Sequence, residues 1–235
     1  MLSKLCKLIR LSPNCSKPRN AAFDTFTYHH MAGVLTAQSC LDWFAQEKAQ
    51  SSANYCLGYD GTIGGCVDEN NRPWTTSSRA NDNRAITFEL SNSKTGGDWL
   101  VSDATIEAAI NLSVDICKRH GKNNVLWFAD KDKTLAYKPK KNEVVVTVHH
   151  WFANTNCPGK YLESKLPYMV SEINKRLREG EKPVAKDPWY IADGTWQKAK
   201  ELGLMDGTRP KDNVTRAELA AVVVRLYDKV KGGDK

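Results

Sequence analysis

The sequence of 235 residues lacks any apolar run long enough to cross a lipid bilayer. Residues 1–17 are basic and mildly apolar, but Lys4, Lys7 and Arg10 interrupt each apolar stretch, and no small-residue cleavage site follows. These absences predict a chain that has no membrane partner and that is made in the cytoplasm without a signal peptide.

The sequence also lacks paired cysteine motifs of the C-x-x-C type. Its seven cysteines are odd in number and irregularly spaced, which argues against a disulfide framework and against a structural zinc site built on cysteine pairs. We expect Cys56, Cys66 and Cys117 to behave as small buried hydrophobic residues. Cys157 differs from these because it lies shortly after a pair of histidines.

Basic residues outnumber acidic ones by 34 to 27, which gives a formal net charge of +7. They are spread over 118–141 and 160–186 and are not interleaved with aromatic residues, so the pattern does not indicate a nucleic-acid partner. The charge favours an anionic polymer as partner, although an ordinary solvated surface explains it equally well.

The order of strand-like and helical patterns predicts an α/β fold, with a mixed central sheet flanked by helices and a small all-α domain after it. We predict an N-terminal extension (1–20), a main domain (21–179), a charged linker with proline (180–186) and a C-terminal domain (187–235). Strands are expected at 23–29, in a hairpin around Asp60-Gly61, at 85–90 and at 144–150. Helices are expected at 36–50, at 103–120 with Asp103 as the N-cap, and at 160–178.

Two histidine doublets contain all but one of the five histidines, and each follows a β-prone run. Successive side chains of a strand point to opposite faces, so each doublet offers one imidazole to a given site. Two imidazoles and the thiolate of Cys157 suit zinc, and three protein ligands leave a fourth position open for water. The spacing leaves open which histidine of each doublet is used, and ordinary strand-ending histidines are the alternative.

Four stretches resemble a known family: YHHMAG (28–33), ANYCLGYDGTI (53–63), AITFEL (85–90) and HHWFANTNCPG (149–159). They are similar to the zinc-dependent N-acetylmuramoyl-L-alanine amidases of type 2, a group that includes phage endolysins and peptidoglycan recognition proteins. The resemblance extends over about residues 20 to 178 and makes the main domain the catalytic one.

This resemblance implies a Zn²⁺ site formed by His29, His149 and Cys157, with His30 and His150 outside the ligand set. The implied reaction is hydrolysis of the amide between N-acetylmuramic acid and L-Ala of the peptidoglycan stem peptide by zinc-activated water.

Glu89 is the residue expected to move protons in this reaction. Alternation in AITFEL places it on the strand face opposite Ile86, Phe88 and Leu90, and the resemblance makes it the general base and then the acid. The chain has Ala53 where some members of the family have a catalytic tyrosine. Because that tyrosine is missing, we expect catalysis to depend more strongly on Glu89.

Thr155 stands where some members of the family have a lysine. We expect its hydroxyl to donate to the oxyanion. In the polar loop 72–82, Trp74 and Arg79 are expected to stack on sugar and to pair with a stem-peptide carboxylate, while simple packing by Trp74 is the alternative.

The C-terminal segment, with LGLMDG (202–207) and VTRAELA (214–220), resembles an S-layer homology repeat. The resemblance implies binding of an anionic secondary cell-wall polymer through Arg216. Such repeats usually come in threes, so a single copy predicts a homo-oligomer, and a helix hairpin used only for assembly is the alternative. An apolar stripe is expected along the last helix: Leu219, Val222, Val223, Leu226 and Val230.

Together these features predict a phage endolysin that acts on the cell wall of a Gram-positive host after its release, with peptidoglycan as its partner. A host autolysin, a non-catalytic peptidoglycan-binding module and a structural zinc protein are the rival interpretations.

Overall fold

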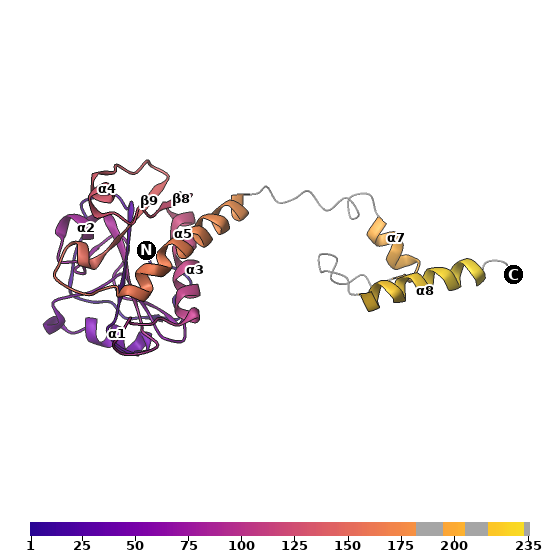
Figure 1. The fold of residues 1–235 in the computed structure, drawn as a ribbon, viewed down its shortest axis with the longest axis horizontal. Coiled ribbons are helices and arrows are strands. Elements are labelled where there is room, and N and C mark those ends of the chain that lie inside the picture. The colour runs from indigo at the N-terminus through magenta and orange to yellow at the C-terminus, as the bar shows by residue number, and fades with distance from the viewer. Residues whose placement is uncertain (182–194, 205–215, 233–235) are drawn as a thin grey trace. The chain divides into compact units, whose positions relative to one another are not determined.

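The computed structural model describes residues 1–181, 195–204 and 216–232, which fall in two compact units, Met1–Glu181 and Lys182–Lys235 (Figure 1). The strands are β1 (Leu8–Ile9), β2 (Cys15–Ser16), β3 (Thr25–His30), β4 (Tyr55–Leu57), β5 (Ile63–Gly65), β6 (Arg72–Pro73), β7 (Ala85–Leu90), β8 (Asn124–Leu126) and β9 (Glu143–Val148). The α-helices are α1 (Ala37–Phe44), α2 (Arg79–Arg84), α3 (Asp103–Arg119), α4 (Lys131–Ala136), α5 (Lys160–Glu181), α7 (Thr195–Glu201) and α8 (Arg216–Gly232), and short 3-10 helices are η1 (Glu47–Ala49) and η2 (His149–Trp151).

A seven-stranded sheet with the order β1-β5-β4-β7-β3-β9-β8 forms the centre of the first unit. All neighbouring pairs are parallel except the β4–β5 hairpin, which confirms the predicted α/β fold with a mixed sheet. Strands β3, β7 and β9 lie side by side and end at the same edge, so the residues that follow them meet there.

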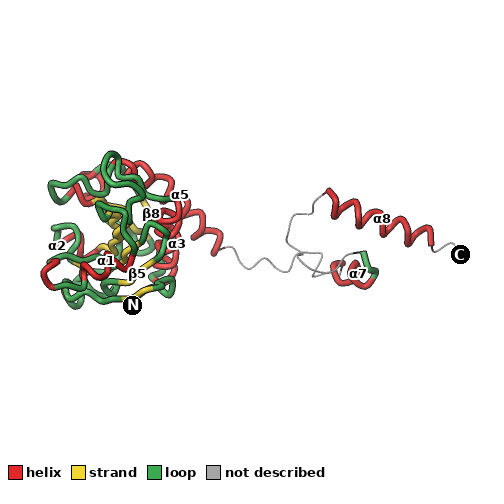
Figure 2. Tube along the Cα trace, turned by 90° about the horizontal axis from the view of Figure 1, so that it is seen from below, coloured by secondary structure: helices red, strands yellow, loops and turns green. Residues whose placement is uncertain are grey.

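One face of the sheet is apolar and is covered by α3 and α5, which pack against each other (Figure 2). Phe26 and Tyr28 from β3 and Phe88 from β7 are fully buried there, and the Tyr28 and Phe88 rings stack with centroids 4.9 Å apart. Burial of such side chains contributes about 1.5–3 kcal/mol each. This face therefore supplies most of the core.

The other face of the same strands is polar. Thr27 on β3 and Thr147 on β9 share a hydrogen bond of 2.8 Å, and the Asn81 side chain donates to Thr27 at 3.0 Å. Asn81 belongs to α2, which begins within the polar loop predicted at 72–82. The prediction missed α2 because a six-residue polar helix carries no apolar stripe.

Other boundaries also differ from the predictions. Helix α3 is capped by Ser102, whose hydroxyl accepts from the Thr105 N–H at 3.1 Å, so the N-cap assigned to Asp103 is wrong. The helix predicted at 36–50 is shorter, because α1 ends at Phe44 and a separate 3-10 turn follows. Strand β9 ends at Val148, so the second histidine doublet begins η2 instead of ending a strand.

The N-terminal segment is part of the first unit. Strand β1 adds to the sheet edge beside β5, and β2 pairs with β6. Nearby, the buried Glu69 accepts hydrogen bonds from Arg119 at 2.6 and 2.8 Å, and His120 lies at 2.7 Å. The Tyr55 hydroxyl also contacts Glu69 and accepts from the Ser3 N–H at 2.9 Å. This network fixes the start of the chain to the C-terminal end of α3.

In the second unit, the described residues form α7 and α8. The Leu219, Val223, Leu226 and Val230 side chains of α8 are exposed. The predicted linker lies mostly in 182–194, outside the described residues. Across the described ranges, no helix is both long and apolar enough to cross a membrane.

Candidate metal centre

Three side chains predicted as ligands meet at the edge of the sheet where β3 and β9 end. The candidate ligand atoms of His29, His149 and Cys157 all lie within 4.8 Å of one another. The Cys157 Sγ lies 3.5 Å from the His29 Nδ1, and the two imidazole centroids are 4.7 Å apart. The His150 N–H donates to the Cys157 carbonyl at 3.0 Å, which fixes the cysteine loop against η2.

An independent observation supports metal binding by His29, His149 and Cys157, which we call the triad. The Nε2 atoms of His29 and His149 are buried, and neither has a hydrogen-bond partner among the described residues. A buried polar atom without a partner is costly, by about 1–3 kcal/mol. The two imidazoles together with the Cys157 thiol form a donor set that suits zinc, and three protein ligands leave one position open.

Burial decides the protonation states of the two imidazoles. Burial lowers the pKa of His29 well below its usual value, and the nearby His149 and His30 lower it further. Burial is also the main cause of the lowered pKa of His149. Both imidazoles are therefore neutral, the form that binds a metal. Burial raises the pKa of the Cys157 thiol, and a bound cation would reverse that by favouring the thiolate.

Glu89 lies on β7 beside the triad, with its Oε1 3.9 Å from the His29 Nδ1. Its side chain is 14% exposed, while Phe88 and Leu90 on either side point into the apolar core, as the strand alternation predicted. Burial, with a smaller effect from Cys66, raises the pKa of Glu89 to about 8. A carboxyl group with a pKa near neutrality is able both to accept and to return a proton.

Thr155 lies on the loop between η2 and Cys157. Its Oγ1 accepts a hydrogen bond from the Cys157 N–H at 3.2 Å. Within the described part of the chain this is its one side-chain bond, so the hydroxyl proton is available to another acceptor near the triad.

The remaining histidine of each doublet points away from the triad. The His30 Nδ1 lies 3.1 Å from the Asn92 Oδ1, and the imidazole packs on Trp99 with centroids 4.8 Å apart. The His150 Nε2 lies 3.1 Å from the Glu163 carboxylate. Strand alternation explains this division at His30, but at His150 the turn of η2 explains it.

Comparison with known proteins decides the family. The family model for N-acetylmuramoyl-L-alanine amidases, Amidase_2, matches residues 19–160. The chain belongs to this amidase family. No protein of curated function matches the amidase in sequence.

Solved structures with similar folds include PlyL, at 15% identity and a TM-score of 0.50, covering 71% of this chain and 95% of that chain. The endolysin amidase LysCS from Clostridium intestinale URNW, at 17% identity and a TM-score of 0.47, covers 74% of this chain and 97% of that one. The likeness to PlyL supports the fold alone.

The predicted substrate-binding residues of the amidase lie on the segment that packs beside β7. The Trp74 indole N–H donates to the Ser16 hydroxyl at 3.1 Å, so its polar atom ties this segment to β2. Arg79 is the first residue of α2 and is exposed. In the second unit, Arg216 is the first residue of α8.

Sequence reasoning missed two residues near the amidase triad. Asn92 positions His30, and Trp99 packs on it, but both follow β7 in a polar loop without a motif. Trp99 has a φ of 57°, unusual for a bulky residue. No local pattern encodes this conformation, so the sequence carries no signal for it.

Proposed function

We propose that the amidase is zinc-dependent and cleaves the amide between N-acetylmuramic acid and the L-Ala of the stem peptide, as a phage endolysin that acts on the wall of a Gram-positive host. The observation that carries the proposal is the convergence of His29, His149 and Cys157 beside the carboxyl group of Glu89. Zinc bound by these ligands would polarise the scissile carbonyl and lower the pKa of a bound water toward about 7.

The chain's own groups would supply the proton transfers and the charge stabilisation. Glu89 takes a proton from the attacking water and returns it to the leaving amine, which is otherwise a poor leaving group. The Thr155 hydroxyl, with its proton free, donates to the oxygen that becomes negatively charged. Arg79 pairs with a carboxylate of the stem peptide.

A non-catalytic peptidoglycan-binding module is the main rival. A binder has no need of two neutral imidazoles with unpartnered nitrogens, nor of a nearly buried carboxyl group with a raised pKa. These features favour catalysis. A host autolysin would share this chemistry and differ in origin.

Digestion of purified peptidoglycan tests the proposal. We expect new L-Ala amino groups without new reducing sugar ends, and complete loss of this activity after treatment with a zinc chelator. Reducing ends without amino groups would indicate a glycosidase and contradict the proposal, as would full activity in the metal-free protein.

For the second unit we propose binding of an anionic cell-wall polymer through Arg216, with assembly of several chains through the exposed apolar residues of α8. The net charge of +7 would support the approach to such a polymer, and salt would weaken the attraction. Deletion of 187–235 should lower both wall binding in sedimentation assays and the mass measured by light scattering. Unchanged values for both would refute this part.

A further inference from the structure

Three cysteines, which we call the thiol cluster, gather on the same face of the sheet as Glu89. Cys40 on α1, Cys56 on β4 and Cys66 just after β5 are buried in the smaller of the two core clusters. Cys56 and Glu89 are register partners on neighbouring parallel strands, so both side chains point to the same face. The reaction proposed above uses none of these thiols.

Cys56 contacts both other thiols of the cluster. Its side chain is in hydrogen-bonding contact with the side chains of Cys40 and Cys66. Cys117, which was also expected to be a simple buried residue, lies instead in the larger core cluster on the other face of the sheet. Contact between thiols is what oxidation to a disulfide requires, so the thiol cluster differs in chemistry from an isolated buried cysteine.

Helix α1 lies very close to the hairpin formed by β4 and β5. A Cβ added to Gly58 would lie 2.8 Å from the Ala37 N, and one added to Gly64 would lie 2.8 Å from the Leu41 Cδ1. Neither position has room for a side chain, so glycine at both allows the helix to approach the strands. This approach brings the cysteine of α1 within reach of the cysteine of β4.

The geometry favours Cys40 over Cys66 as the disulfide partner of Cys56. Cys56 lies opposite Gly64 in the hairpin, and Cys66 is two residues further along, so Cys56 and Cys66 are diagonal neighbours. Diagonal neighbours are about 7–8 Å apart, whereas a disulfide spans about 4.4–6.8 Å between Cα atoms. A bond to Cys66 would therefore bend the hairpin, while Cys40 belongs to a separate element to which this register does not apply.

We propose that Cys40 and Cys56 form an oxidation site that reacts with a low-molecular-weight disulfide and becomes a disulfide itself. The reactant exchanges first at Cys40, which at 6% exposure is the least buried of the three, and one small thiol leaves. The Cys56 sulfur then attacks the Cys40 sulfur, and the second small thiol leaves. The two cysteines lose two electrons and two protons, and the two small thiols carry them away.

Cys66 serves the second step by accepting the proton of Cys56. A thiolate, not a thiol, attacks a disulfide, and burial raises the pKa of Cys56. The hydrogen bond with Cys56 lowers the pKa of Cys66, which is the only one of the seven cysteines with a lowered pKa. Cys66 therefore ionises more readily than its neighbour and can take up the proton that Cys56 must release.

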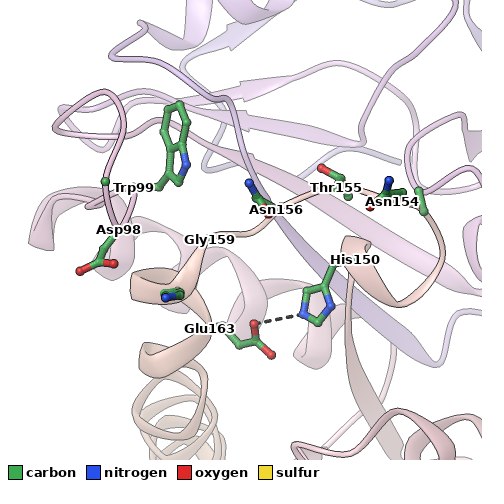
Figure 3. Close-up of a pocket in the computed structure, with 11 residues that line it drawn as sticks. Asp98, Trp99, His150, Asn154, Thr155, Asn156, Gly159 and Glu163 are labelled. Carbon is green, nitrogen blue, oxygen red and sulfur yellow. Dashed lines mark hydrogen bonds and ion pairs between the residues drawn. The ribbon is translucent and has the colours of Figure 1, made fainter.

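The thiol cluster is separate from the cavity that opens beside the 150–156 turn. This cavity, of about 470 Å³, is lined by the loop that carries Trp99, by that turn and by the start of α5. Figure 3 shows the pair of His150 and Glu163 at its wall. None of the residues that line the cavity belongs to the thiol cluster, so a ligand bound there would not contact the thiols.

The cross-link would fasten α1 to β4 on the face that carries Glu89. Disulfides form and persist outside the reducing cytoplasm, so the bond would form after the chain has left the host cell interior. That route belongs to the proposed function, whereas the exchange chemistry does not depend on it. The thiols would thus stabilise this face of the sheet in the surroundings where the enzyme is proposed to act.

Oxidised glutathione added to the zinc-loaded, full-length protein tests the proposal. We expect peptide mass mapping to show a bond between Cys40 and Cys56, and the Tm to rise by about 5–10 °C and to return after reduction. Cys40→Ala and Cys56→Ala should each abolish the rise. Cys66→Ala should slow bond formation without preventing it, and an unchanged rate would remove the proton-accepting role of Cys66.

Cys117→Ala is the matched control, because it removes a buried thiol from the other face and should retain the full Tm rise. A bond between Cys56 and Cys66, or a rise that persists in Cys56→Ala, would overturn the assigned pair. Absence of any disulfide at Cys56 would overturn the site, and glutathione attached to the half-buried Cys15 would show that the reagent was active. Mass and Tm are read without substrate, so failure here is distinct from failure of the amidase reaction.

Discussion

The two faces of the central sheet differ in chemistry, although β3, β7 and β9 contribute side chains to both. On β7, Phe88 packs into the apolar core, while the next residue, Glu89, stands beside the triad. On β3, Tyr28 and His29 divide in the same way. The apolar face obeys the rule that buried side chains are hydrophobic, and the polar face breaks it with imidazoles, hydroxyls and a carboxyl group.

The polar face of the sheet contains groups that lower the stability of the fold and that are expected to serve the reaction. The polar face contains buried groups whose solvation is lost and whose pKa values are shifted, and the unpartnered imidazole nitrogens lie there as well. Substitutions on this face should therefore change activity more than stability, and substitutions on the other face should do the reverse.

Removal of a proposed metal ligand should give the largest effect. In Cys157→Ala only two of the three proposed ligands remain, so we expect loss of bound zinc and of amide hydrolysis, with the sheet intact because a small side chain is removed. Metal analysis of the purified protein and release of amino groups measure the two quantities. Cys117→Ala, which removes a buried thiol on the α3 side, is the control and should retain the metal. Stoichiometric zinc in Cys157→Ala would contradict the assigned ligand set.

Replacement of Glu89 should give the next largest effect. Glu89→Gln keeps the shape but removes the exchangeable proton, so kcat should fall by about 10²- to 10⁴-fold while zinc content stays constant. The free energy of unfolding should not fall, since the amide avoids the cost of burying a carboxyl group. A variant with normal kcat would assign proton transfer to another group.

The adjacent residue on the opposite face should show the reverse pattern. Phe88→Ala removes a fully buried ring that contacts Phe26, Tyr28 and Tyr55, and should lower the free energy of unfolding by about 3–5 kcal/mol. The fraction that stays folded should bind zinc and keep kcat within a small factor, as judged by urea titration and by activity per folded molecule. A selective loss of kcat without loss of stability would show that the two faces are not separate.

Sequence reasoning captured what depends on local alternation. The pattern AITFEL placed Glu89 and Phe88 on opposite faces, because a strand has a strict period of two. Sequence reasoning also singled out the histidine doublets and Cys157 as candidate ligands. The structure brings His29, His149 and Cys157 together, while their role as metal ligands stays a prediction.

Features that depend on distant segments were not predictable. The bend at Val148 that turns the second doublet into η2 has no glycine or proline to mark it. The conformation of Trp99 requires the approach of Gly159, from another part of the chain. Pairing of β1 with β5 depends likewise on a register between remote residues.

Substitution of Glu69, at the margin of the apolar face, should give the smallest of these effects, and this effect should depend on pH. Burial alone would raise the pKa of Glu69, but hydrogen bonds from Arg119, His120 and Tyr55 outweigh it and lower the pKa from 4.5 to about 2. A depressed pKa means that the ionised carboxylate stabilises the fold above about pH 4.5, and that this stability is lost as the pH falls toward 2. Glu69→Gln should therefore cost about 2 kcal/mol in unfolding free energy at pH 7.

The difference between wild type and Glu69→Gln should shrink progressively between pH 4.5 and pH 2, as measured by urea unfolding at each pH. Glu107→Gln is the matched control, because Glu107 pairs with Arg176 at an exposed position and should change stability by at most about 1 kcal/mol. A difference that stays constant with pH would assign the stabilisation by Glu69 to shape and neutral hydrogen bonds. A difference that follows the pH, with kcat per folded molecule unchanged, would show that the charge of Glu69, on the apolar side of the sheet, serves the fold.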